Sequence, residues 1–142
     1  MPDDIPTPPH AYVPGQNARH PEDWFDGIKA EVAAGLPTER TQAWRAGLWY
    51  LDKGYFWECH EVLEAVWMAL PNPSPERDMT QALIQLANAR LKLKMGKPRA
   101  TLRLCVMVQG LLDDQQGAIL GVDVDWLRSQ CIVAELEARQ GR

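Results

Sequence analysis

The sequence predicts an all-α protein. Apolar residues recur at three-to-four spacing in several long segments, and none of these segments alternates in the way that a half-buried strand does. Breaks that contain glycine or proline separate the segments, and these connections are short. Because short connections make neighbouring helices antiparallel, we expect a single compact bundle of five or six helices stacked as antiparallel hairpins.

The first half of the chain predicts two helices joined tightly. Pro21 suits the first turn of a helix, and Gly35 and Pro37 end that segment. Thr38 can cap a second helix, which carries apolar residues at helical spacing up to Gly54.

The second half predicts four more helices. A third runs from about residue 55 to 70 and stops at the turn formed by residues 71–73, because proline resists continuing a helix. Ser74 caps a fourth helix that should reach residue 95, where a glycine and a proline follow. A fifth is expected over about 99–116, and a sixth follows a cap at Asp123 or Asp125.

The amino terminus differs from the rest of the chain. Residues 1–20 hold five of the eleven prolines, so we expect an extended arm there and a single helical domain over residues 21–142. Apolar residues such as Val13 could pin the arm to the domain, or the arm could be solvated. His10 and His20 are expected to be exposed.

Composition excludes several classes of partner. The net charge is −4 and the basic residues are dispersed, so we expect no binding to nucleic acid. No apolar run is long enough to cross a membrane, and the acidic, proline-rich start does not look like a signal peptide, so we expect a cytoplasmic protein. The three cysteines show no Cys-x-x-Cys spacing and are expected to be reduced, with Cys59 in the core.

The third predicted helix carries one polar stripe. Successive helical residues are rotated by about 100°, which places His60, Glu61 and Glu64 on one side of the helix. Trp57 and Trp67 flank this stripe. Since a solvated face would rarely carry two tryptophans, these polar groups are candidates for lining a cleft.

The fourth predicted helix carries a matching stripe. If the two helices form a hairpin that turns near residue 72, Glu64 faces Gln81 and His60 faces Gln85. We therefore predict a polar pocket between the third and fourth helices. These groups could instead satisfy one another in a buried hydrogen-bond network without any chemistry.

Three functional interpretations remain open. The first is a binding or interaction domain, with a small ligand or a protein as its partner and with self-association left open. The second is a hydrolase-type enzyme in which a divalent metal held by His60 and Glu64 activates water, although these residues alone give fewer ligands than a catalytic zinc needs. The third is a scaffold like the tetratricopeptide repeats, because Gly54-Tyr55 and Gly96-Lys97 both mark glycine turns between helices.

A basic cluster straddles the turn at Gly96, between the fourth and fifth predicted helices. It could grip an anion, but cations near the carboxyl end of a helix also stabilise the helix alone. Its members are Arg90, Lys92, Lys94, Lys97, Arg99 and Arg103.

From about residue 40 to 112 the chain resembles a bacterial and archaeal family, domain of unknown function 309. The family pattern is a glycine and an aromatic residue, then Glu-Ala-His-Glu-x-x-Glu-x-x-Trp, then Gln-Gly-Leu-Ile-Gln and a Gly-Asn turn. The matching residues are Glu58, His60, Glu61, Glu64, Trp67, Gln81, Leu83, Ile84, Gln85 and Gly96. The departures are Cys59, Ala82 and Lys97. The resemblance implies a helical bundle and makes His60, Glu64 and Gln85 part of a family pattern, but it implies no reaction.

Overall fold

The computed structural model describes residues 4–140 and confirms the all-α fold. Its helices are α1 (Asp26–Ala33), α2 (Gln42–Lys53), α3 (Phe56–Ala69), α4 (Pro75–Lys94), α5 (Pro98–Leu111) and α6 (Val124–Gln140). Two short 3-10 turns, Glu22–Phe25 and Thr38–Arg40, precede α1 and α2. The strands β1 (Ala118–Ile119) and β2 (Val122–Asp123) complete the described elements.

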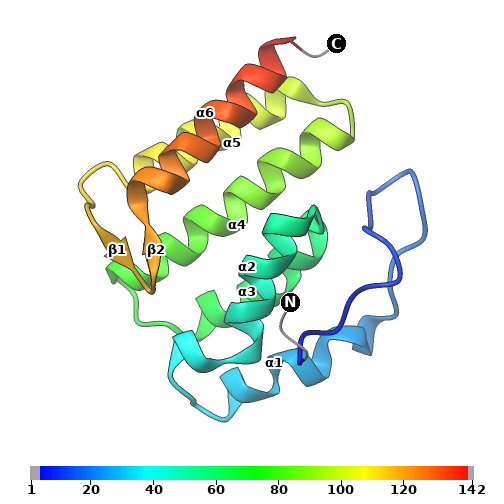
Figure 1. Cartoon of the computed structure of the whole chain (residues 1–142), viewed down its shortest axis with the longest axis vertical. Coiled ribbons are helices and arrows are strands. Elements are labelled where there is room, and N and C mark those ends of the chain that lie inside the picture. The colour runs from blue at the N-terminus through cyan, green and yellow to red at the C-terminus, as the bar shows by residue number, and fades with distance from the viewer. Residues whose placement is uncertain (1–3, 141–142) are drawn as a thin grey trace.

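Consecutive helices from α2 to α6 pack against each other as antiparallel neighbours (Figure 1). The α1 helix packs on both α2 and α3, and α6 contacts α4 as well as α5. As a result α3 is covered by α1, α2 and α4. In turn, α4 lies between α3 on one side and α5 and α6 on the other (Figure 1).

Side-chain and glycine caps set several helix boundaries. The Ser74 hydroxyl accepts a hydrogen bond from the backbone N–H of Arg77 at 3.1 Å, as predicted. Gly54 ends α2 in the left-handed conformation with φ of 89°, which glycine adopts without steric strain. Thr41, and not Thr38, caps α2 by accepting from the N–H of Trp44, because residues 38–40 form a separate 3-10 turn.

The segment between α5 and α6 differs from the prediction. The α5 helix ends at Leu111, five residues before the expected end, and a small antiparallel hairpin pairs Ala118 with Asp123. The turn is formed by Leu120 and Gly121, which both have positive φ; Gly121 adopts this conformation freely, whereas Leu120 adopts it at a steric cost. This hairpin delivers the chain to the start of α6.

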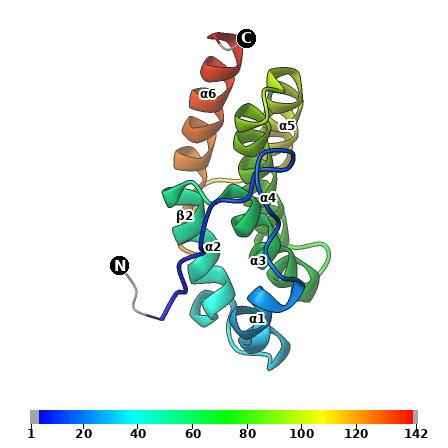
Figure 2. The same ribbon diagram turned by 90° about the vertical axis from the view of Figure 1, so that its right-hand side faces the viewer.

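The described part of the arm, residues 4–20, contains no helix and is held against the domain (Figure 2). Ile5 and Val13 are buried, and the Tyr50 hydroxyl donates a hydrogen bond to the carbonyl of Pro6 at 2.6 Å. At the other end of the arm, the Gln16 side chain donates to the carbonyl of Lys94 at 2.7 Å. Of the two alternatives for the arm, the structure therefore shows the pinned one.

No helix in residues 4–140 combines the length and the hydropathy that crossing a lipid bilayer demands.

Candidate functional site

The predicted acidic stripe lies on a partly exposed face of α3. Nε2 of His60 lies 3.0 Å from Oε2 of Glu64, one helical turn away, and the two side chains are 27% and 53% exposed. Glu61 is paired with Lys29 of α1, whose Nζ donates to Oε2 at 2.9 Å. These polar groups therefore bond within α3 or to α1.

The predicted partners on α4 do not reach this stripe. Gln81 and Gln85 are half-buried, and the side-chain oxygen of Gln85 accepts a hydrogen bond from Asn88 on its own helix at 3.2 Å. Within residues 4–140, no hydrogen bond joins His60 or Glu64 to either glutamine. The predicted cross-helix network does not form, because buried apolar side chains such as Leu63, Val66 and Leu83 fill the interface of α3 with α4.

The two tryptophans of the predicted site lie near opposite ends of α3. Trp67 is covered by Arg77 of α4, whose guanidinium carbon lies 4.0 Å from the ring centroid, and its buried Nε1 has no hydrogen-bond partner among the described residues. Trp57 contacts the arm, with the Tyr12 ring centroid 5.0 Å away. The helix therefore separates these two rings.

The His60–Glu64 pair permits a direct test of its energetic role. We expect His60→Ala to lower the free energy of unfolding by no more than about 0.5 kcal/mol, because exposed pairs of this spacing contribute little. Urea denaturation measures this change, and Glu64→Ala provides the matched variant from the other side of the pair. A loss above about 2 kcal/mol would instead indicate a buried network around His60.

The polar pair that the structure buries is a different one. Glu58 of α3 is fully buried, and its Oε2 accepts hydrogen bonds from Nε2 of His20 at 2.6 Å and from the backbone N–H of Tyr12 at 2.8 Å. His20 is only 5% exposed, so the prediction that it lies in solvent is wrong. The reason is that the arm folds back and carries His20 between Trp24, Phe25 and Trp57.

Burial around Glu58 affects its neighbours. Burial, together with the charge of Glu58, raises the pKa of the Tyr50 phenol well above its usual range. The same two causes raise the pKa of the Cys59 thiol, so this cysteine stays protonated in the core and is not an activated nucleophile. The Tyr50 phenol and the Cys59 thiol beside Glu58 therefore both stay neutral.

A small hollow of about 210 Å³ lies beside the buried pair. Arg19 and His20 line it together with Trp57 and Glu61, two residues of the predicted site. Arg19 lies over the Trp57 ring at 5.4 Å, and Glu61 is already paired with Lys29. Because its volume is below that of most ligand sites, we interpret this hollow as part of the surface on which the arm packs.

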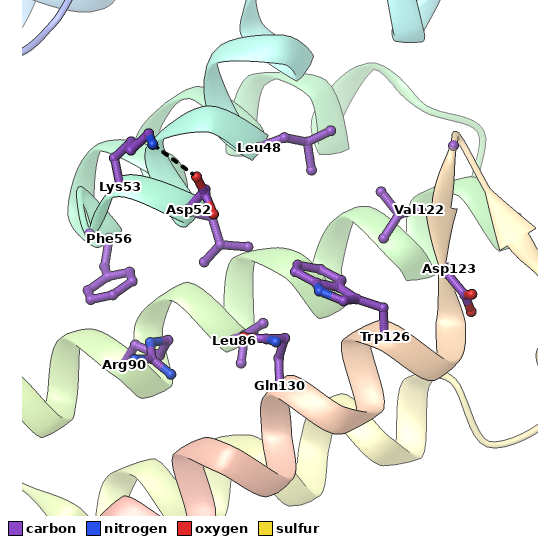
Figure 3. Close-up of a pocket in the computed structure, with 13 residues that line it drawn as sticks. Leu48, Asp52, Lys53, Phe56, Leu86, Arg90, Val122, Asp123, Trp126 and Gln130 are labelled. Carbon is purple, nitrogen blue, oxygen red and sulfur yellow. Dashed lines mark ion pairs between the residues drawn. The ribbon is translucent and has the colours of Figure 1, made fainter. Parts of the chain in front are cut away.

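A larger hollow lies elsewhere, in a groove of about 870 Å³ between α2, α4 and α6 (Figure 3). Helix α4 forms its floor, the end of α2 with the start of α3 forms one wall, and β2 with α6 forms the other. Its apolar lining consists of Leu48, Leu51, Phe56, Leu86, Val122 and Trp126. We call this feature the α2–α6 groove.

Charged side chains occupy both ends of the α2–α6 groove. Lys53 and Arg90 lie near Phe56 at one end, and Asp123 lies near Val122 at the other (Figure 3). Trp126, which is 43% exposed, projects from α6 toward the side on which Leu48 lies. The predicted pocket residues on α3 and α4 do not line this groove, but Arg90, a member of the basic cluster identified in the sequence, does.

The fold and the groove define a small all-helical domain with a ligand-sized concavity. The family model of a domain of unknown function, DUF309, matches residues 44–104, as the sequence resemblance predicted. No curated protein and no solved structure matches the chain. The matched segment covers α3 and α4 entirely, whereas the arm and α6 lie outside it.

Proposed function

We propose that this protein is a binding domain for a small organic molecule with an apolar body, which occupies the α2–α6 groove. The observation that carries the proposal is the groove itself, since about 870 Å³ lies within the usual range of ligand sites. An apolar lining with a few charged groups at its ends is typical of such sites.

The groove is better suited to a small molecule than the other surfaces are. It is concave and combines side chains from five elements, α2, α3, α4, β2 and α6, of which Leu48, Leu86 and Trp126 approach a common space in Figure 3. In contrast, the exposed apolar residues of α5 and α6, such as Val106 and Ile132, do not line this groove. A ligand in the groove can therefore lose most of its contact with water, which is the main source of apolar binding energy.

The enzymatic alternative receives less support from the geometry. His60 and Glu64 offer two metal ligands, and no group of three or more potential protein ligands occurs in residues 4–140. A catalytic zinc needs three. We therefore favour binding over metal-dependent hydrolysis, and we propose the cytoplasm as its compartment because the three cysteines are free and buried.

Titration with octan-1-ol tests the groove. We expect isothermal titration calorimetry to detect binding, and we expect Trp126→Ala to weaken it about tenfold, because a large aromatic ring in contact with the ligand is lost. Ile132→Ala is the matched control, since Ile132 is 53% exposed on the same helix and does not line the groove. Absence of octan-1-ol binding, or equal weakening by both variants, would overturn the proposal.

A further inference from the structure

The end of the α2–α6 groove beside Phe56 holds an excess of positive charge. Arg90 lines the groove, and its guanidinium carbon lies 5.4 Å from the Phe56 ring centroid. Its nearest acidic partner is Glu137, at 3.8 Å, and this carboxylate is itself 50% exposed. The Arg90 side chain is only 24% exposed, so it is partly desolvated without a close counterion.

Lys94 adds a second cation at the same end. It lies one helical turn beyond Arg90 on α4, and its Nζ is 5.2 Å from the same Phe56 ring. Within residues 4–140, the only hydrogen bond of its ammonium group is a long one of 3.5 Å to the carbonyl of Gly54. No carboxylate of residues 4–140 forms an ion pair with Lys94.

The acidic residues of the groove have partners of their own. Asp52 is paired with the adjacent Lys53, whose Nζ lies 3.4 Å from Oδ2. Asp123 accepts a hydrogen bond from the backbone N–H of Asp125 at 2.8 Å, at the positive end of the α6 dipole. In contrast, Arg90 has only the long 3.8 Å contact with Glu137, and Lys94, which lies against the groove residue Phe56, forms no ion pair within residues 4–140.

From this charge distribution we propose that the ligand of the α2–α6 groove is an amphipathic carboxylate, whose anionic head binds Arg90 and Lys94 while its apolar tail lies against Leu86 and Trp126. This inference rests on the proposed function of the groove. A guanidinium presents paired N–H donors that match the two oxygens of a carboxylate, and an ammonium adds a less directional charge. The planar Phe56 ring beneath both cations keeps water from one side of the head group.

Three ligands of equal chain length test the head group. Calorimetric titration of the whole protein with octanoate, octan-1-ol and octylammonium should show octanoate binding about tenfold more tightly than octan-1-ol, with octylammonium weakest. The preference for octanoate should decrease as salt is added, because the charged groups are partly exposed. Equal affinities for octanoate and octan-1-ol would overturn the carboxylate while leaving the groove function intact, whereas absence of binding by all three would overturn the groove itself.

Charge-neutralising variants locate the head group. Arg90→Gln should reduce octanoate affinity about tenfold, to that of octan-1-ol, and a cooperative thermal unfolding transition shows that the variant is folded. Arg103→Gln removes the same charge from an exposed position on α5 outside the groove and should leave octanoate affinity unchanged. If Arg90→Gln does not fold, Lys94→Gln, which alters an exposed side chain, should still weaken octanoate about threefold. An unchanged octanoate affinity in the tested variant, or equal loss in Arg103→Gln, would overturn the proposal.

Discussion

Glu58→Ala is expected to lower the free energy of unfolding by roughly 3 to 5 kcal/mol, because it removes the acceptor of two buried hydrogen bonds. The imidazole of His20 and the backbone N–H of Tyr12 would both lose their partner, and the space of a fully buried side chain would be left empty. Urea denaturation followed by tryptophan fluorescence measures the change, since Trp57 and Trp24 lie beside His20.

The controls for Glu58 separate a buried role from a general effect of charge. Glu64→Ala removes a carboxylate from the same helix at a side chain that is 53% exposed, and we expect a change below about 1 kcal/mol. His20→Ala and the double variant complete a thermodynamic cycle, in which the double variant should cost less than the sum of the single ones. If Glu58→Ala is no more costly than Glu64→Ala, the buried pair does not hold the arm.

Gly47→Ala should destabilise the protein by about 2 kcal/mol, although alanine is the better helix former. A methyl group at residue 47 of α2 would lie 2.5 Å from Cγ of Leu63 on α3. Leu63 is fully buried, so it has no free space into which it can move. The thermal midpoint and the urea midpoint should both fall.

Two variants test whether the clash with Leu63 is the cause. Combining Gly47→Ala with Leu63→Ala should cost about 1 kcal/mol less than the sum of the two single changes, because the added methyl group fills space that the leucine vacates. Gly110→Ala in α5 meets no atom within 4 Å of the new carbon, and it should instead raise stability by about 0.5 kcal/mol. A neutral Gly47→Ala would contradict the close packing of α2 on α3.

The helices could be predicted from the sequence because their signals are local. Ser74 caps α4 through the amide three residues ahead, and Gly54 ends α2 through its own backbone conformation. The hairpin before α6 could not be predicted in this way. Its strands are only two residues long, too short for an alternating pattern, so the sequence predicts residues 112–116 as a continuation of α5.

The surroundings of α3 could not be predicted from one hairpin. Pairing α3 with α4 alone placed Gln85 opposite His60, but α1 and the arm also cover α3. Glu58 and His20 are 38 residues apart, and no periodic pattern within a helix can bring such residues together. The only local signal is that Glu58 is an acidic residue within a largely apolar helix, and the family pattern that contains it names no partner.

The α2–α6 groove joins two parts of the chain with different relationships to the family. Leu48, Phe56 and Arg90 lie inside the matched segment, whereas Val122 and Trp126 come after it. A protein that shares only this segment would retain the cationic end and the floor, and it would build the opposite side from unrelated residues. Selectivity for the tail of a bound molecule could then diverge among homologues while recognition of its head stayed the same.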